Sequence, residues 1–409
     1  MLKLKVVFFL MLIMALVFTS SIRIIKAENV DITINSDGSI NPETAPIVID
    51  GAKYLITADI TGSITIRRSN ILLDGGGHTL QGIGDVYETE NATEYGVFLI
   101  NIESMWVQNL TVKGFNYGIY LQSALKCVIT ECSTTENGLD GIKLDSSFDN
   151  FILKNTITSN ADDGIQLFRS GNNSVAGNLI RDNNFETAYT TIKDATPAGI
   201  QVNALHSPAV SVNNLITGNT IEGGITGIIL GYESSSTTVI WNTLKENSEC
   251  GIEIDMKSTG NVVHHNNFIK NTHQAVAPEG EITLWDDGKQ GNYWSDYNGT
   301  DSDQNGIGDT AYDSIDRYPL ITQVNIEDAQ ISPPEIQLIA PSPSPDSQVS
   351  PSPDSHYEPY SLMPLDVILG LLAALFIGVI LVIIVTRIER RQKHKHENKE
   401  IDNTPFSLY

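Results

Sequence analysis

A short phrase recurs along the middle of this 409-residue chain: glycine, an aliphatic residue, any residue, and a second aliphatic residue. The glycines that begin the phrase are Gly96, Gly118, Gly141, Gly164, Gly199, Gly227 and Gly251. By subtraction they lie 22, 23, 23, 35, 28 and 24 residues apart. A period near 23 residues with strand-like alternation is typical of a solenoid whose coils stack on one another.

A column of polar residues repeats with nearly the same period. In a β-solenoid, equivalent residues of successive coils lie about 4.8 Å apart, so inward asparagines can hydrogen-bond along the axis. The column consists of Asn109, Cys132, Asn155, Asn178, Asn219, Asn242 and Asn266. A further column at a later turn consists of Asn137, Asn160, Asn183, Asn247 and Asn271. We therefore expect buried asparagine ladders, with Asn109 and Cys132 turned inward.

The composition of the repeats decides between types of solenoid. They are rich in Val, Ile, Thr, Asn and Gly and alternate with period two, which argues against a helical repeat. A leucine-rich repeat would need several leucines per coil, and these are missing. The sequence predicts an all-β, right-handed, single-stranded parallel β-helix of about nine or ten coils. The repeats are expected over residues 70–280 and a C-terminal cap over 281–325.

Three features give the repeats a family resemblance. They are the Gly-Ile-x-Leu and Asn-x-Ile columns, the opening coil 70–80 (NILLDGGGHTL), and the final coil 291–297 (GNYWSDY) with Asp301–Asp309 and Tyr318–Leu320 behind it. Over roughly residues 45–325, they resemble the NosD-like right-handed β-helix family, which is grouped with carbohydrate-binding and sugar-hydrolase repeats. The resemblance implies the fold and is far less specific for chemistry.

Copper binding is a property that the resemblance to NosD-like proteins implies. The residues for it are few, since His264, His265 and His273 are the one tight histidine cluster outside the tail. Neighbouring residues of a strand point to opposite faces, so His264 and His265 are not expected to bind one ion together. We therefore expect no copper site.

Both ends of the chain carry membrane-related segments. Residues 1–27 combine a short basic start, an apolar run and an alanine before Glu28, which is the layout of a secretory signal peptide. Basic residues behind the apolar run leave an uncleaved anchor as the alternative. Residues 365–386 contain a run of twenty uncharged residues and predict one transmembrane helix. The basic tail at 387–409 places the C-terminus in the cytoplasm.

Between the repeats and the predicted span, residues 331–364 are rich in proline and serine and predict an extended stalk. The chain is therefore expected to be a single-pass type I cell-surface protein, with an extracellular ectodomain over 28–330. Such spacers resemble those of archaeal surface proteins, with a Gram-positive bacterium as the alternative. A formal net charge of −24 argues against nucleic acid as a partner.

Four Asn-x-Ser/Thr sequences are potential glycosylation sites. Asn91, Asn172 and Asn298 fall in connections between repeats and are expected to carry glycans. Asn109 belongs to the inward column and is expected to stay unmodified.

Outward positions of the middle coils are polar and form the candidate ligand-binding patch. Its residues follow the repeat glycines and are Lys143, Asp145, Gln166, Arg169, Gln201 and Asn203. Insertions around 183–197 and 204–213 flank one of these coils. Loops that grow on a regular scaffold often carry recognition, so we expect them to wall a shallow glycan-binding groove.

Asp140 and Asp163 each precede a repeat glycine on adjacent coils, which places them within about 5 Å of each other. They are weak candidates for acid–base catalysis, because like charges at that distance perturb each other's titration. Asp162-Asp163-Gly164 resembles the paired aspartates of polygalacturonases, but the Gly-His-Gly and Arg-x-Lys elements of those enzymes are missing. The alternative is that Asp-Gly simply makes a turn.

A calcium loop is expected near the C-terminal end of the repeats. Asp301, Asp303, Asn305 and Asp309 occupy positions 1, 3, 5 and 9 of such a loop, but position 12 is Tyr312 rather than an acid. A hydrogen-bonded turn that caps the solenoid is the alternative.

These features favour a non-catalytic surface protein that binds glycans or forms part of the envelope structure, with cell-envelope glycans or surface proteins as its partners. The first alternative is a lyase, epimerase or hydrolase that acts on acidic polysaccharides. A copper-related periplasmic protein, as the NosD resemblance implies, is the second alternative.

Overall fold

The computed structural model describes residues 29–83, 94–183, 197–204, 211–255, 257–278, 282–329 and 331–332. All of them belong to the first of two compact units, which spans residues 1–342. The expected signal peptide, membrane span and basic tail lie outside these residues, as does nearly all of the expected stalk. Within the described ranges, no helix is both long enough and apolar enough to cross a membrane.

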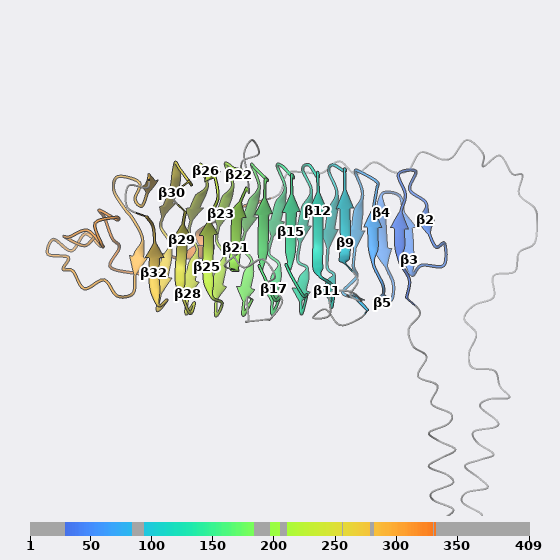
Figure 1. Ribbon diagram of the computed structural model, residues 1–409, viewed down its shortest axis with the longest axis horizontal. Coiled ribbons are helices and arrows are strands. Elements are labelled where there is room, and N and C mark those ends of the chain that lie inside the picture. The colour runs from blue at the N-terminus through green and yellow to red at the C-terminus, as the bar shows by residue number, and fades with distance from the viewer. Residues whose placement is uncertain are drawn as a thin grey trace, which may run out of the picture. The chain divides into compact units, whose positions relative to one another are not determined.

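The described part is a right-handed parallel β-solenoid of about nine turns, in which each complete coil adds one strand to each of three sheets (Figure 1). Sheet A contains β2 (Ile40–Asn41), β1 (Ile32–Ile34), β6 (Ile64–Ile66), β9 (Tyr95–Ile100), β12 (Tyr117–Gln122), β15 (Ile142–Asp145), β18 (Ile165–Phe168), β21 (Ala198–Asn203), β25 (Thr226–Leu230), β29 (Cys250–Ile254) and β32 (His273–Val276). Sheet B contains β3 (Ile47–Asp50), β4 (Lys53–Ile56), β7 (Leu72–Asp74), β10 (Trp106–Gln108), β13 (Val128–Thr130), β16 (Phe151–Leu153), β19 (Ser174–Ala176), β23 (Leu215–Thr217), β27 (Thr238–Ile240), β30 (Asn261–His264) and β33 (Thr283–Leu284).

Sheet C runs from β5 to β34 along the third side of the solenoid. It contains β5 (Ile60–Thr61), β8 (Thr79–Gln81), β11 (Thr111–Lys113), β14 (Ser133–Thr135), β17 (Thr156–Thr158), β20 (Leu179–Arg181), β24 (Thr220–Glu222), β28 (Thr243–Lys245), β31 (Asn267–Ile269) and β34 (Tyr293–Trp294). A short pair, β22 (Ser211–Val212) and β26 (Ser234–Ser235), lies at one corner.

The strands of sheet A confirm the register that the glycine column predicts. β12 and β15 pair Ile119 with Ile142, and β18 and β21 pair Ile165 with Ile200. All four isoleucines are completely buried. Because a strand alternates its faces, the residue after each of them points outward. The core is therefore a stack of aliphatic side chains, and sheet A presents a regular outer face.

The repeat needs glycine at these positions because the next coil leaves no room for a side chain. A Cβ atom at Gly141 would lie 2.8 Å from the side-chain nitrogen of Asn160 and 2.8 Å from the carbonyl oxygen of Gly164. Neither contact leaves room for a methyl group. The glycine column therefore marks the places where each coil approaches the next most closely.

The asparagine ladder is confirmed. Asn178 donates from Nδ2 to Oδ1 of Asn219 at 2.9 Å and to the carbonyl oxygen of Ile152 at 2.9 Å. Its own Oδ1 accepts the backbone N–H of Asn155 at 2.9 Å. The same pattern continues from Asn219 through Asn242. Each buried amide thus satisfies backbone groups at a turn that would otherwise lack partners.

The expected place of Asn109 in this ladder is wrong. β10 pairs in register with β13, so that Leu110 aligns with Cys132 and Asn109 aligns with Glu131. Leu110 is buried, whereas Asn109 is half-buried in a turn with a φ of 53°. Equivalent residues of these two coils are 22 positions apart in the sequence. Counting back 23 positions from Cys132, as in the other coils, gives Asn109 instead of Leu110. Cys132 is inward as predicted, and its backbone N–H donates to Oδ1 of Asn155 at 2.9 Å.

A third asparagine ladder lies at the corner between sheets A and B and was not predicted from the sequence. Asn150 donates from Nδ2 to Oδ1 of Asn173 at 3.0 Å, and Asn173 donates to Oδ1 of Asn214 at 3.2 Å. These residues are separated by the same intervals, 23 and 41, as the predicted column. The spacing could therefore have identified them.

Aromatic residues close the C-terminal end of the solenoid. Trp294 is buried and stacks between Phe268 and Tyr312, with ring centroids 4.4 Å and 4.2 Å away. Its indole N–H donates to Oδ2 of Asp316 at 2.8 Å. Trp285 is buried beside it, at a centroid distance of 6.0 Å. These aromatic side chains cover the last coil of the solenoid.

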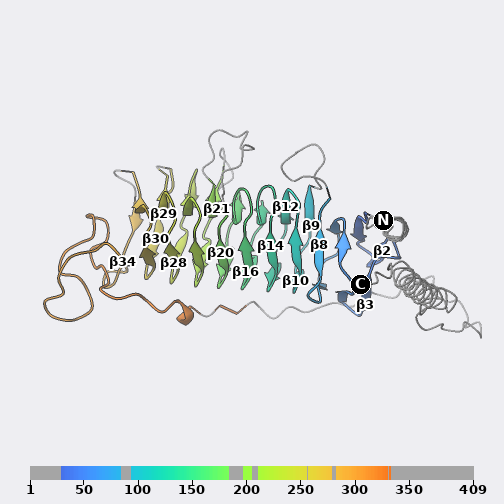
Figure 2. The same cartoon turned by 90° about the horizontal axis from the view of Figure 1, so that it is seen from below.

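Beyond this cap the chain runs back along the outside of the solenoid (Figure 2). Val324 exchanges two hydrogen bonds with the side chain of Asn267 on β31, at 2.8 and 3.0 Å. After a short 3-10 helix, η1 (Ile326–Asp328), Ala329 packs against Gly218 between β23 and β24. The end of the described chain therefore lies beside the middle coils.

Candidate functional site

Polar side chains cross the outer face of sheet A over β15, β18 and β21. Lys143, Gln166 and Gln201 occupy equivalent positions on these strands and are named here the polar row. Gln166 donates from Nε2 to Oε1 of Gln201 at 2.8 Å, and Nδ2 of Asn203 donates to the same oxygen at 2.6 Å. Four of the predicted patch residues thus lie on one face, and three of them form a continuous hydrogen-bonded group.

The two remaining patch residues bind each other. Arg169 donates from Nη2 to both carboxylate oxygens of Asp145, at 3.0 and 3.1 Å, and its guanidinium group lies 4.3 Å from the ring centroid of Phe168. Tyr120 donates to Oδ2 of Asp145 at 3.3 Å. Arg169 and Asp145 are therefore held by partners of this chain and form one border of the polar row.

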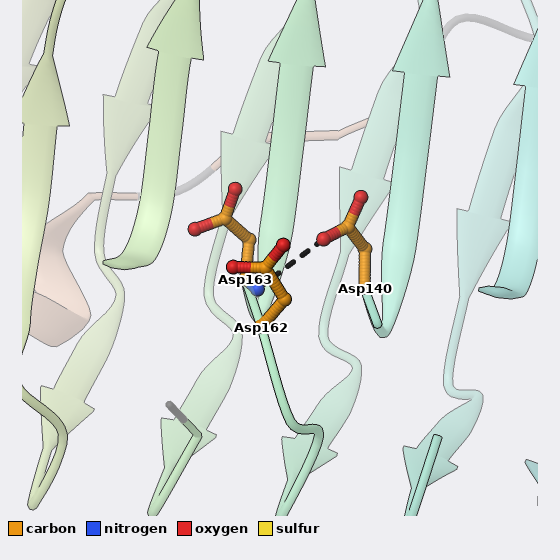
Figure 3. Close-up of side chains that lie close together, drawn as sticks. All are labelled: Asp140, Asp162 and Asp163. Carbon is orange, nitrogen blue, oxygen red and sulfur yellow. Dashed lines mark hydrogen bonds between the residues drawn. The ribbon is translucent and has the colours of Figure 1, made fainter. Parts of the chain in front are cut away.

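Three aspartates gather at the start of β15 and β18 (Figure 3). Asp140, Asp162 and Asp163, named here the acidic trio, each place a ligand oxygen within 4.8 Å of the others. Asp140 and Asp163 are buried, and Asp162 is half-buried. The predicted proximity of Asp140 and Asp163 is confirmed. Asp162 was not selected from the sequence, although it directly precedes a selected residue.

The members of the acidic trio differ in their hydrogen bonds. Oδ1 of Asp140 accepts the backbone N–H of Asp163 at 3.2 Å, and Oδ1 of Asp163 accepts the backbone N–H of Ala198 at 2.6 Å. Gln166 donates to Oδ2 of Asp163 at 3.0 Å. Among the described residues, none donates a hydrogen bond to the carboxylate of Asp162. Asp140 and Asp163 thus join neighbouring coils, whereas Asp162 makes no such link within the described part of the chain.

Burial and the repulsion between neighbouring carboxylates raise the pKa values within the acidic trio. Burial, followed by the charge of Asp140, raises the pKa of Asp162 to about 7. Burial is also the main reason that the pKa values of Asp140 and Asp163 are raised. Lys143 opposes these shifts, since its Nζ lies 3.3 Å from Oδ2 of Asp140. Although burial disfavours the ammonium group, the adjacent Asp140 raises the pKa of Lys143 overall.

Four aromatic rings lie next to the polar row, on β9 and β12. Tyr95, Phe98, Tyr117 and Tyr120, named here the aromatic platform, stack with centroid separations of 4.5 to 5.8 Å and interplanar angles of at most 26°. Nζ of Lys143 lies 4.7 Å from the ring centroid of Tyr117 and connects the platform to the polar row. The sequence places Phe98 and Tyr120 at outward positions, but the joint stack of four rings depends on the coil register.

β9 and β21, the first and last strands of this face, each follow a long connection in the sequence, from β8 and from β20 respectively. Most residues of the predicted groove walls, 184–196 and 205–210, lie outside the described residues, as does Asn91. The role of these insertions in binding stays a prediction. Asn172 and Asn298 are described, and both are exposed, as their expected glycosylation requires.

The acidic loop at 301–309 binds its own backbone. Asp301 accepts the N–H groups of Asn305 and Gly306, at 3.0 and 2.9 Å. Asp303 accepts from Asn305 at 3.2 Å, and Asp309 accepts the hydroxyl groups of its neighbouring loop residues. In the part of the chain that the structure describes, the acidic trio is the one group of three His, Cys, Asp or Glu ligands this close together. Calcium binding at 301–309 stays a prediction.

The expected separation of His264 and His265 is wrong. Their Nδ1 atoms lie 2.6 Å apart. His265 has a φ of 55°, so the strand alternation ends at His264 and the next side chain turns back to the same side. Burial and the neighbouring His265 lower the pKa of His264. His273 belongs to β32 on sheet A and is remote from this corner of sheet B.

Comparison with known proteins agrees with this architecture. Residues 47–207 match the family model described as right handed beta helix region, and residues 190–299 match the model of the periplasmic copper-binding protein NosD. Together these two matches cover residues 47–299 and support a NosD-like right-handed β-helix family for this chain. This NosD-like chain is 32% identical over 149 residues to the probable ABC transporter binding protein NosD of Pseudomonas aeruginosa, covering 35% of this chain and 33% of the relative. It is 31% identical over 142 residues to the protein of the same name from Stutzerimonas stutzeri, covering 32% and 31%.

The match to these curated relatives therefore spans about a third of their length. Among solved structures, the periplasmic alginate epimerase AlgG is similar, with 14% identity, a TM-score of 0.40, and coverage of 57% of this chain and 68% of that one. The tailspike protein 2 of bacteriophage CBA120 shows 14% identity and a TM-score of 0.40 over 59% of this chain and 41% of that one. At this level of similarity, neither structure assigns an activity to this NosD-like chain.

The family description names copper, so the side chains of the described residues are compared with the usual ligands of this metal. Imidazole nitrogen and cysteine or methionine sulfur are the usual protein ligands of copper. Cys127, Cys132 and Cys250 are each buried and free. Burial raises the pKa values of their thiol groups to about 12, 12 and 11 respectively. Two imidazole nitrogens converge, those of His264 and His265. The described residues thus supply a pair of nitrogen donors for copper, and no group of three ligands that includes them.

Proposed function

We propose that this NosD-like chain is an exported, membrane-anchored surface protein that binds a glycan of the cell envelope across sheet A. The family model describes a periplasmic protein, which agrees with the secretory signal expected at residues 1–27. The anchor is the span expected at 365–386, with the ectodomain outside the cell. The binding face comprises the aromatic platform and the polar row.

One observation carries the proposal: the aromatic platform lies directly beside the polar row on adjacent strands of one sheet. A sugar ring has an apolar face that packs on an aromatic ring and a rim of hydroxyl groups that need hydrogen-bond partners. Binding sites of this type combine aromatic surface with a few fixed polar groups. The five strands from β9 to β21 span roughly 19 Å, which suits an extended oligosaccharide rather than a single sugar.

Unused hydrogen-bonding capacity lies next to the polar row, on Asn203, whose Nδ2 donates to Gln201 of the row. Oδ1 of Asn203 is buried and has no hydrogen-bond partner among the described residues. A buried acceptor without a partner is unfavourable by about 1–3 kcal/mol, and a ligand hydroxyl group would remove that deficit. The side chains of Gln166 and Gln201 hold Asn203 in place through their shared hydrogen bonds.

The binding experiment uses the full-length chain on an array of neutral, amino and uronic-acid oligosaccharides. We expect Tyr117→Ala and Asn203→Ala each to weaken binding by about tenfold or more, since each removes roughly 1–3 kcal/mol of contact. Tyr232→Ala is the matched control, because Tyr232 is an exposed tyrosine that belongs neither to the platform nor to the row. Binding that survives both Tyr117→Ala and Asn203→Ala would contradict the proposed face.

A second function, acid–base catalysis on the bound glycan, is favoured by the acidic trio. A half-buried carboxyl group with a pKa of about 7 can donate a proton at neutral pH, and Asp162 has both properties. In glycosidases, two carboxyl groups flank the scissile bond at about 5–5.5 Å in retaining enzymes and at wider separations in inverting ones. The 4.8 Å proximity of the trio is nearer to the retaining arrangement.

The catalytic alternative makes its own prediction. If Asp162 is a general acid, the full-length chain should release reducing or unsaturated ends from a glycan that it binds. Asp162→Asn should then lower that rate by at least 100-fold and leave glycan affinity unchanged. Glycan binding without any release of new chain ends would reject catalysis and leave the binding proposal intact.

A further inference from the structure

The corner after β30 brings two imidazole rings together in an unusual way. His264 is the last residue of the strand, and His265 follows with a left-handed backbone, φ 55°. In a continuing strand the two side chains would point to opposite faces. The left-handed turn instead brings Nδ1 of one ring to within 2.6 Å of Nδ1 of the other.

Gln290 determines which nitrogen of His265 carries the proton. Nε2 of His265 lies 3.0 Å from Oε1 of Gln290. An amide oxygen only accepts, so Nε2 must be the donor, and the neutral ring then has its lone pair on Nδ1. This lone pair points at His264. Histidines that bind metals typically have this second-shell arrangement, in which the far N–H donates to a carbonyl or carboxylate group.

The surroundings hold the pair in place and are negatively charged. The ring of Trp241 packs on His265 at a centroid distance of 4.7 Å. Asp287 lies close enough to interact electrostatically with both histidines, and its Oδ1 accepts the backbone N–H groups of Lys289 and Gln290 at 2.8 and 2.7 Å. A fixed carboxylate next to two convergent nitrogens attracts a cation.

We propose that Nδ1 of His264 and Nδ1 of His265 together bind one transition-metal ion of the imidazole-preferring class, with Cu(II) bound most tightly. When both rings are neutral, one Nδ1–H bridges the two nitrogens. Metal binding moves that proton of His264 to its own Nε2, and both Nδ1 lone pairs then bind the ion. No net proton is released. Affinity at nitrogen sites rises through Ni(II) to Cu(II) and falls again at Zn(II). The proposal thus names the residues of this chain that would bind the copper of the family description. The site is independent of the proposed glycan face.

The experiment titrates Cu(II) into the full-length chain and records the electron paramagnetic resonance spectrum of the bound ion. The tail histidines His394 and His396 are first replaced by glutamine, since they could also bind copper. We expect one bound Cu(II) with hyperfine splitting from two nitrogens. His264→Gln and His265→Gln should each abolish that spectrum. His273→Gln, which removes an exposed histidine on another sheet, should leave it unchanged.

A second variant separates metal binding from a mere hydrogen bond between the rings. Gln290→Leu leaves both histidines in place but removes the acceptor that sets the tautomer. We expect it to weaken Cu(II) binding by about 10- to 100-fold, as loss of a second-shell partner does elsewhere. Circular dichroism spectra and thermal unfolding without metal show whether each variant is folded. A two-nitrogen spectrum that persists in both histidine variants, or no Cu(II) bound by the chain with the tail substitutions, would overturn the proposal.

Discussion

Asp140 and Asp162 stand on adjacent coils, and each places a carboxylate oxygen within 4.8 Å of the other. Twenty-two residues separate them in the sequence, so their proximity is a direct result of coil stacking. The pKa of Asp162 is raised to about 7, by burial first and by the charge of Asp140 second. This arrangement makes a prediction for stability as well as for chemistry.

We expect the contribution of Asp162 to stability to fall as the pH rises. A folded-state pKa above the ordinary value of 3.8 means that the folded chain holds the proton more tightly than the unfolded chain does. The contribution is therefore fully present below about pH 4 and is lost as the pH rises through about 7. Asp162→Asn removes the titration, so it should stabilise the chain at pH 8 by roughly 2 kcal/mol after allowance for solvent screening.

Urea unfolding of the wild type and Asp162→Asn at pH 5 and pH 8 measures this effect. Asp149→Asn is the control, because Asp149 is an aspartate that belongs to another turn and lies outside the acidic trio. Equal effects of the Asp162 substitution at both pH values would contradict the assigned burial of its charge.

The asparagine ladder predicts a large stability change at a polar residue. Asn178→Ala removes an amide that makes four hydrogen bonds to neighbouring coils, and leaves buried partners on Asn155, Asn219 and Ile152 unsatisfied. We expect destabilisation by about 3 kcal/mol or more, measured by urea unfolding. Asn298→Ala, at an exposed position in the cap, should change stability by less than about 0.5 kcal/mol. Similar values for the two variants would show that the ladder adds little.

Calcium should stabilise the cap if the loop at 301–309 binds it. We expect added calcium to raise the thermal unfolding temperature of the full-length chain, and a chelator to reverse the rise. Asp301→Asn should abolish the response, since Asp301 is the first ligand of the predicted loop. Unchanged unfolding with calcium would identify the loop as a turn held by the backbone contacts of Asp301 and Asp303.

Glycosylation should be confined to exposed acceptors. Asn172 and Asn298 are exposed, and we expect peptide mass spectrometry of the chain from its own host to find glycans on both. Asn109 lies outside the ladder but is half-buried, and its Nδ2 donates to Oδ1 of Asp74 at 3.3 Å. We expect it to remain largely unmodified for this reason. A fully occupied Asn109 would show that this contact opens readily.

Much of the solenoid follows from local spacing. Glycine recurs at positions equivalent to Gly141, and asparagine at positions equivalent to Asn178. The reason is that each stacked coil has the same steric and hydrogen-bonding requirements about every 23 residues. The polar row was predictable for the same reason, since alternation along a strand decides which side of the sheet Lys143 and Gln166 occupy. Where a coil is one residue shorter, the same arithmetic fails, and Asn109 was assigned the place that Leu110 occupies.

The candidate sites depend more on tertiary structure. The four rings of the aromatic platform come from two coils, and their joint stack needs the register between β9 and β12. His264 and His265 are adjacent in sequence, yet their convergence depends on a left-handed residue at the end of a strand, which alternation does not foresee. Asp162 becomes a distinct carboxyl group because its neighbours Asp140 and Asp163 are occupied by backbone N–H groups of other coils.

The sequence by itself thus determined the repeat, the all-β solenoid and the outward face, because these depend on periodic demands that each coil makes on the next. The tertiary structure alone decided which side chains meet at a turn and which carboxyl group of the acidic trio accepts no hydrogen bond from the described residues. Such contacts depend on single backbone dihedral angles and on burial from several coils at once, and neither quantity is periodic along the chain.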